Sequence, residues 1–228
     1  MKIQYLAHSF FKFSFKGLNV LVDPFINHNS KDAKYKSLIE CPVCEDDLND
    51  ISLILVTHEH FDHCDRQAIE CIAKRDSACV VAHESVMRNL DIPDTLKKPV
   101  SIGENINFKG AAVKAFPAHH PSSFYPMSFL LTCDNLSLFH AGDTDILDAF
   151  NSITPDIALL PIGGNMTMDL IDAVKVTKTM KPRAAIPMHY NTFDFIMADP
   201  SEFSYRINKS ILKTKPIILE PGKSFSLE

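Results

Sequence analysis

Apolar and polar residues alternate in the first segment of the chain. Between residues 10 and 15, Phe11, Phe13 and Phe15 alternate with Lys12 and Ser14. A period of two is typical of a β-strand with one buried and one exposed face. Apolar runs predict strands over 3–7, 10–15 and 18–22, with Gly17 in the turn between the last two. The polar, irregular segment 24–50 predicts a surface excursion with one short helix.

Beyond residue 50, all-apolar runs alternate with helical patterns. The run Leu-Ile-Leu-Val at 53–56 has no polar position, as a strand buried on both faces requires. Further strands are predicted over 78–82, 106–108, 112–116, 129–133, 136–139, 157–160, 184–187, 216–219 and 224–227. Helices are predicted over 66–74, 83–90, 169–180 and 200–207. Many strands interspersed with helices predict the α/β class, with sheets covered by helices.

Length and charge restrict the class of protein. The 228 residues predict a single domain over 1–228, because undivided domains often reach this size. A net charge of −5 without a strong basic cluster argues against nucleic-acid binding. The apolar runs fall far short of the roughly 18 residues of a membrane span, and the first residues lack the pattern of a secretory signal. We therefore expect a cytoplasmic protein that binds neither nucleic acid nor membranes.

The glycines and cysteines exclude other chemistry. The seven glycines form neither G-x-G-x-x-G nor a P-loop, which excludes nucleotide binding through those loops. Without a secretory signal, the six cysteines are expected to be free thiols. Cys41 and Cys44 have C-x-x-C spacing, but no second pair or histidine stands at the distance of a structural zinc site. This argues against a metal or redox role for the pair.

The strongest chemical signal is a cluster of histidines and an aspartate directly after the apolar run 53–56. Thr57 leads into His58, His60, Asp62 and His63. Imidazole is the commonest metal ligand, and a carboxylate adds an oxygen donor. So many polar groups at the end of a buried strand are costly to satisfy unless they share a partner. The pattern favours a metal site over a solvated histidine-rich loop.

The spacing H-x-H-x-D-H after a buried strand resembles the metallo-β-lactamase superfamily. Four residues match the remaining motifs of that superfamily in order: Asp23 at the end of strand 18–22, His120 in Ala-His-His-Pro-Ser-Ser, Asp143 in His-Ala-Gly-Asp-Thr, and His189 in Pro-Met-His-Tyr-Asn-Thr-Phe. The resemblance extends from about residue 3 to residue 222. It implies a four-layer αβ/βα sandwich.

Three further segments resemble one branch of the superfamily. Leu-Ala-His-Ser at 6–9 and the segments 160–168 and 189–193 are similar to metal-dependent hydrolases related to ascorbate-6-phosphate lactonase. Members usually carry glycine where this chain has Ala7 and Glu59, and Asn165 follows two glycines where an acidic residue plus asparagine is common. These departures affect loop shape and substrate fit, but none removes a ligand.

The resemblance implies two metal sites that share a carboxylate. The first set of ligands is His58, His60 and His120, and the second is Asp62, His63 and His189, with Asp143 bridging. Two divalent ions so held share one water, lower its pKa and stabilise the oxyanion formed on attack. Asp62 would orient the hydroxide or act as the catalytic base. The absence of cysteine from the ligand positions suits hard or borderline ions, of which zinc is favoured, with manganese and iron as alternatives.

The remaining candidates leave alternatives open. His119 competes with His120 for the same ligand position, and the spacing favours His120. His8 either faces the site or caps a strand, and Tyr190 is a second candidate for the pocket wall. We expect His28 and His83 to lie at the surface. His140 is expected to have a supporting role, and Cys64 to be a buried core thiol.

These observations predict hydrolysis of a small, anionic ester, lactone or phosphoester by a metal-bound hydroxide. One alternative is an iron-dependent oxidoreductase of the same fold, but the oxygen-reducing type has glutamate where this chain keeps His60. Another is an RNA or DNA phosphodiesterase, against which the charge and the short chain argue. A non-catalytic module that keeps its metals for stability is a third. A homo-oligomer is compatible with the sequence.

Overall fold

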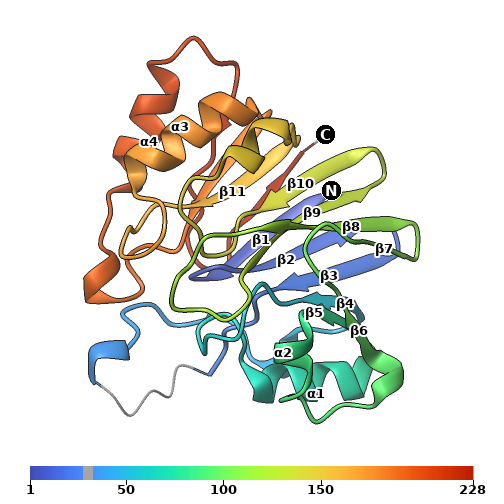
Figure 1. Cartoon of the computed structure of the whole chain (residues 1–228). Helices are drawn as coiled ribbons and strands as arrows, with labels where there is room; N and C mark the ends of the chain where they lie inside the picture. Colours follow the sequence, from blue (N-terminus) through green and yellow to red (C-terminus); the bar gives the residue numbers. More distant parts are fainter. Residues whose placement is uncertain (28–32, 228) are drawn as a thin grey trace.

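Two mixed β-sheets occupy the middle of the computed structural model, which describes residues 1–27 and 33–227 (Figure 1). Within these residues the first sheet has seven strands in the order β14-β1-β2-β3-β4-β5-β6. Its strands are β1 (Lys2–Ala7), β2 (Phe10–Phe15), β3 (Leu18–Val22), β4 (Ile51–Leu55), β5 (Cys79–Ala82), β6 (Lys97–Pro99) and β14 (Ser224–Ser226). Strands β14, β1, β2 and β3 pair antiparallel, and β3 to β6 pair parallel.

The second sheet also has seven strands in the described part of the chain, in the order β13-β12-β11-β10-β9-β8-β7. Its strands are β7 (Asn105–Phe108), β8 (Ala111–Pro117), β9 (Met127–Cys133), β10 (Leu136–His140), β11 (Ile157–Pro161), β12 (Ala184–Met188) and β13 (Lys215–Pro216). Strands β7 to β10 pair antiparallel, and β10 to β13 pair parallel. Each sheet therefore has an antiparallel part and a parallel part.

Helices cover the outer faces of the two sheets (Figure 1). They are α1 (Arg66–Asp76), α2 (Glu84–Met87), α3 (Leu170–Met180) and α4 (Pro200–Asn208), with short 3₁₀ turns at Ala33–Tyr35, Glu45–Asp47, Asp94–Leu96, Asp148–Ser152 and Asp194–Ile196. Helices α1 and α3 each begin after an aspartate whose side chain accepts a backbone N–H of the first turn. Helix α1 packs on β4, and α3 and α4 pack on β11 and β13. The expected αβ/βα sandwich is confirmed.

Apolar side chains fill the space between the layers. The larger cluster includes Phe11 and Phe13 of β2 together with Phe129 of β9, and it continues to the side chains of α3 and α4 that face the second sheet. The smaller cluster lies under α1 and includes Ile54 of β4 and Ile69 of α1. Strand β4 therefore has apolar neighbours on both faces, as its unbroken apolar run predicts. No helix in residues 1–27 or 33–227 has the length and apolar character needed to cross a bilayer.

Most predicted elements are confirmed, and three differ. The helix expected over 83–90 ends at Met87, because the chain turns there to bury Leu90. Strand β6 was not predicted, since the edge strand Lys-Lys-Pro has no alternating pattern. The strand expected over 216–219 is Lys215–Pro216, an edge strand limited by a proline that lacks an N–H. Residues 28–32 of the expected excursion, including His28, lie outside the described residues.

Candidate metal centre

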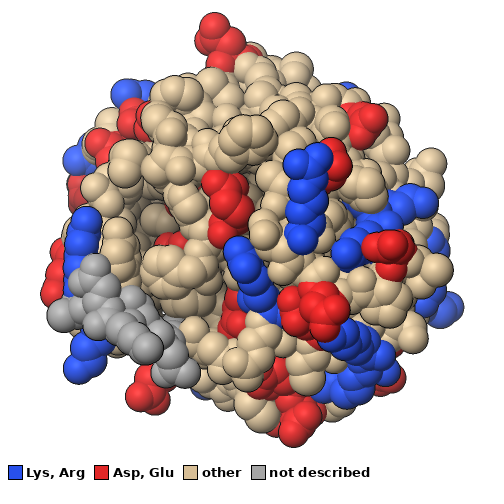
Figure 2. Space-filling model, turned by 60° about the horizontal axis from the view of Figure 1, so that its bottom comes forward, with Lys and Arg blue, Asp and Glu red and all other residues tan. Residues whose placement is uncertain are grey.

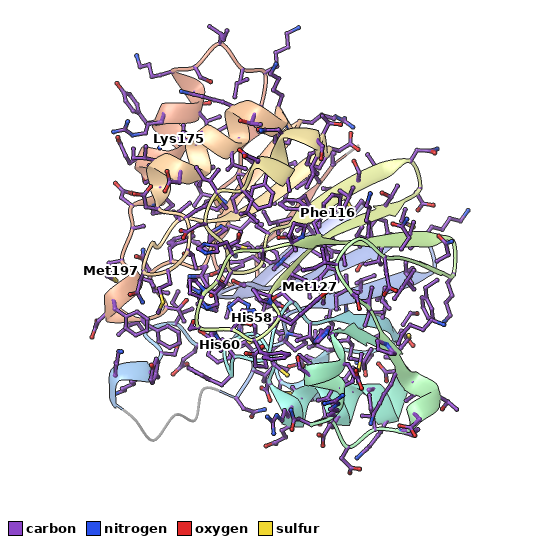
Figure 3. All side chains as sticks on the ribbon, in the orientation of Figure 1. His58, His60, Phe116, Met127, Lys175 and Met197 are labelled. Atoms are coloured by element: carbon purple, nitrogen blue, oxygen red, sulfur yellow. The ribbon has the colours of Figure 1, made fainter. Side chains whose placement is uncertain are left out.

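Five strands end on one side of the molecule, and acidic and histidine residues follow each of them. Asp23 follows β3, the segment 58–63 follows β4, His120 follows β8, Asp143 follows β10, and His189 follows β12. In Figure 3 the labelled side chains of His58 and His60 lie close together among the loops on this side. Because the carboxyl ends of neighbouring parallel strands share an edge, residues far apart in the sequence meet there.

His58, His60 and His120 form a three-imidazole cluster. Nδ1 of His60 lies 3.1 Å from Nε2 of His58 and 3.2 Å from Nε2 of His120. The other nitrogen of each ring faces an oxygen: Thr57 Oγ1 at 3.0 Å from His58, the Ser122 carbonyl at 3.2 Å from His60, and the Met166 carbonyl at 2.9 Å from His120. A neutral imidazole has one N–H, so each ring donates outward. The three lone pairs then point toward one another.

The electrostatics of this cluster favour neutral rings. Burial and the neighbouring His63 lower the pKa of His58 well below its usual value. Burial also lowers the pKa of His120, although Asp143 acts in the opposite direction. Neutral imidazole is the form that binds metal, because protonation occupies the lone pair. His58 and His120 are therefore held in the form that can bind a metal ion.

Asp62, His63, His189 and His8 form a second, mixed cluster, in which one donor atom from each residue lies within 4.8 Å of the others. Asp143 stands between the two clusters. Its Oδ1 lies 3.2 Å from Nε2 of His63, and its Oδ2 lies 3.1 Å from Nε2 of His189 and 3.6 Å from Nε2 of His120. One carboxylate therefore reaches both clusters.

Asp23 holds His63 from behind. The buried carboxylate of Asp23 lies 2.7 Å from Nδ1 of His63, and it also accepts the backbone N–H and the hydroxyl of Thr57. A carboxylate behind a histidine fixes the ring and its tautomer, so Nε2 faces the cluster. Burial disfavours charge on His63, but Asp143 and Asp23 outweigh it and raise the pKa of the ring well above its usual value. The carboxylates of Asp143 and Asp23 therefore favour a positive charge at the position of His63.

Several buried polar atoms of the mixed cluster lack a hydrogen-bond partner among the described residues. They are Nε2 of His8, Nε2 of His63, Nδ1 of His189 and Oδ1 of Asp143; the His63 and Asp143 atoms face each other at 3.2 Å as an ion pair, without hydrogen-bond geometry. Buried polar atoms are nearly always paired, so such a group of exceptions requires a cause. Imidazole nitrogens and carboxylate oxygens are the ligands that zinc and similar divalent ions take. The residues present therefore fit a divalent metal ion.

The backbone around the clusters is tightly constrained. His8, Asp23 and His189 have positive φ angles of 57°, 50° and 54°. Residues other than glycine rarely adopt this region of backbone conformation. Gly142, directly before Asp143, has a φ of 60°, and a Cβ there would lie 2.9 Å from the carbonyl oxygen of Met127. The loop that carries Asp143 thus needs a glycine for both conformation and space.

A pocket of about 400 Å³ opens onto the clusters. Its lining comprises Lys34, Tyr35, His60, Phe61, Asp62, His120, Ser122, Asp143, Asn165, Met166, His189 and Phe195. Figure 2 shows a hollow in the surface on this side of the molecule, surrounded mainly by uncharged residues. His8, His58 and His63 lie behind the lining and are buried. The pocket therefore reaches both clusters without exposing all of their residues.

Comparisons with known proteins agree with this geometry. The β-lactamase superfamily domain matches residues 2–189, a span that contains both clusters. The chain belongs to the metallo-β-lactamase superfamily. Its relatives include UPF0173 metal-dependent hydrolases of Methanopyrus kandleri, 34% identical over 99% of both chains, and of Thermoplasma acidophilum, 40% identical over 89% of both. A metallo hydrolase of Ignicoccus hospitalis has a similar structure, with a TM-score of 0.82, 27% identity and coverage of 100% of this chain and 99% of that one.

The structure brings together all seven residues that the superfamily resemblance implies as ligands. They are His58, His60, Asp62, His63, His120, Asp143 and His189. His119 lies outside both clusters, where its Nδ1 is 3.3 Å from Asp145 on the surface. His120 instead faces His60, because adjacent residues at the end of a strand point in opposite directions. The geometry thus favours His120 for the position that the sequence left open.

Two residues of this superfamily member have contacts that the sequence did not specify. His8, for which pocket and capping positions were both considered, belongs to the mixed cluster. Burial and the neighbouring His189 lower its pKa to about 4. The Glu59 carboxylate accepts the Ser123 hydroxyl at 2.9 Å and the Phe124 backbone N–H at 2.8 Å, and so anchors the loop after His120. Both contacts join segments that are distant in the sequence. The only sequence signal for His8 was the Leu-Ala-His-Ser motif at 6–9.

The other candidates have structural surroundings. His140 is buried, and its Nε2 donates to the Ser9 carbonyl. Cys64 is a buried core thiol, as expected. His83 caps α2 and stacks on Tyr125 with its ring centroid 3.7 Å away. Tyr190 is buried, belongs to the larger apolar cluster and is absent from the residues that line the pocket. Neither Cys41 nor Cys44 forms a disulfide within the described residues.

Proposed function

We propose that this protein hydrolyses a small anionic substrate with two divalent ions, one in each cluster. The observation that carries the proposal is the pair of clusters that share Asp143, in each of which the donor atoms lie within 4.8 Å of one another. The ligands of the first ion would be His58, His60 and His120, those of the second Asp62, His63 and His189, with Asp143 touching both. The relatives named metal-dependent hydrolases support the reaction class.

Bound ions would lower the pKa of a water molecule and stabilise negative charge on a substrate oxygen. The chain supplies the remaining functions. The Asp62 carboxylate, which lines the pocket, orients the attacking water or takes its proton. Asp23 fixes the ring of His63, and the carbonyls of Ser122 and Met166 fix those of His60 and His120. Because these donors contain nitrogen and oxygen but no sulfur, they favour zinc, with manganese and iron as alternatives.

The pocket supports a small substrate with a negative charge. A volume of about 400 Å³ is near the lower end of the range for small-molecule pockets. Lys34 brings a positive charge to the lining, where Tyr35, Phe61 and Phe195 provide an aromatic wall. An ester, lactone or phosphoester with an anionic group fits this lining. Phosphorylated lactones are the first compounds to test, because the sequence resembles the lactonase branch.

Metal analysis and a substrate screen together test the proposal. Protein purified without chelator should contain two metal equivalents per chain, and lactones, phosphomonoesters and phosphodiesters should be screened with added zinc or manganese. Dialysis against EDTA should abolish the activity, and the metal should restore it. A single equivalent after reconstitution would contradict the two-ion centre. Iron as the only metal, together with oxygen consumption, would favour the oxidoreductase alternative instead.

A further inference from the structure

His8 is built into the wall of the mixed cluster from the opposite sheet to His189. It lies in the turn between β1 and β2, its side chain is fully buried, and its carbonyl accepts the backbone N–H of His189 at 3.0 Å. The two rings are tilted by 45° relative to each other, with centroids 4.1 Å apart. The position of His8 is therefore fixed by the same loop that carries a predicted ligand.

The hydrogen bonds of His8 direct one lone pair into the cluster. Nδ1 lies 3.0 Å from the hydroxyl oxygen of Thr192, and that hydroxyl faces the Tyr190 carbonyl at 3.4 Å. With the ring proton on Nδ1 and donated to Thr192, Nε2 has no proton to donate. Nε2 lies 3.3 Å from Oδ2 of Asp62, yet it has no hydrogen-bond partner within the described residues. A buried nitrogen lone pair that faces a carboxylate oxygen of the pocket wall is unfavourable unless a cation lies between them.

We propose that His8 is an additional protein ligand of the ion held by Asp62, His63 and His189, an inference that rests on the proposed function. The donor atoms of these four residues lie within 4.8 Å of one another, close enough to share one ion. With Asp143 this ion would have five protein ligands, whereas the ion of the three-imidazole cluster would have four. At a coordination number of five, only the ion with four protein ligands would keep a position for water or substrate. With His8 as a ligand, the coordination position open to water or substrate lies on the ion of the three-imidazole cluster.

Metal titration of a variant tests the ligand role. His8→Gln keeps a polar side chain but removes the imidazole, and His119→Gln is the matched control outside the clusters. Metal-free chains are titrated with Zn²⁺ against a chromophoric chelator. We expect one of the two equivalents of His8→Gln to bind at least about 100-fold more weakly, with the other unchanged and the control like wild type. Two equivalents with wild-type affinity in His8→Gln would overturn the assignment.

The wild-type chain provides a second measurement that needs no substitution. Loaded with ¹¹³Cd²⁺ and labelled with ¹⁵N-histidine, it should show scalar coupling between cadmium and Nε2 of His8, as well as Nε2 of His63. Coupling at His63 with a protonated, uncoupled Nε2 at His8 would mean that His8 only orients Asp62, and would overturn the inference while the two-ion proposal stands. Absence of coupling at every histidine would overturn both.

Discussion

The three-imidazole cluster and the mixed cluster differ in what holds their residues in place. The rings of His60 and His120 donate to carbonyls of surface loops, at Ser122 and Met166. His63 in the mixed cluster is instead supported by the buried carboxylate of Asp23, and the cluster itself contains Asp62. A carboxylate partner raises the basicity of a histidine ligand. Asp23 also supports His58, through the Thr57 hydroxyl, so the contrast lies in His60 and His120. We therefore expect the mixed cluster to bind its ion more tightly, and the three-imidazole cluster to depend more on loop conformation.

Asp143→Ala is expected to have the largest effect, because it removes the group that reaches both clusters. Metal content should fall below one equivalent, and activity should fall by more than the roughly 10²–10⁴-fold typical of a lost general base. Asp145→Ala, two residues further on and exposed, is the control. Elemental analysis and steady-state kinetics measure both effects. Retention of one tightly bound equivalent would mean that the mixed cluster does not need the shared carboxylate.

Asp62→Asn separates catalysis from metal binding in the mixed cluster. The amide keeps the shape of the side chain but cannot take a proton, so turnover should fall by about 10²–10⁴-fold. Because His63, His189 and Asp143 remain, metal analysis should still find two equivalents. Turnover at the wild-type rate for every responsive substrate would show that the activity does not arise at this site.

His120→Ala should weaken only the ion of the three-imidazole cluster. We expect its dissociation constant to rise by about 100-fold or more, with the ion of the mixed cluster unaffected. His119→Ala should retain both affinities, since His119 pairs with Asp145 on the surface. Competitive titration with a chelator measures the two steps. The opposite result for the adjacent histidines would move the ligand position by one residue.

Glu59→Gln is expected to have the smallest effect, through the loop after His120. The variant weakens the hydrogen bonds to Ser123 and Phe124, and a net hydrogen bond is worth about 1 kcal/mol, or roughly fivefold in KM. Metal content and kcat should stay close to wild type. Glu84→Gln, on the exposed face of α2, should change neither constant. A fall in metal content would instead show that the loop controls the three-imidazole cluster directly.

Local sequence signals predicted the strands, the main helices and the histidine motif well. The motif spans the six residues 58–63 shortly after β4, so it can be recognised without knowledge of distant contacts. Its partner His120 lies 60 residues beyond His60 and was assigned through the superfamily resemblance. His8 and Glu59 are different, because their partners Thr192 and Phe124 lie 184 and 65 residues away. Strand β6 was missed since its pairing with β5, rather than its own pattern, makes it a strand. What the sequence left open therefore depends on long-range packing.

The left-handed backbone at His8, Asp23 and His189 also affects how the protein would evolve under selection for stability. A non-glycine residue in this region costs about 1 kcal/mol or more, and glycine or asparagine would relax it. If selection acted only on the folding yield of the metal-free chain, replacements at these three positions would accumulate. Selection for metal binding would remove the same replacements. Thermal robustness and function therefore compete at three identified residues, as expected where strained sites carry activity.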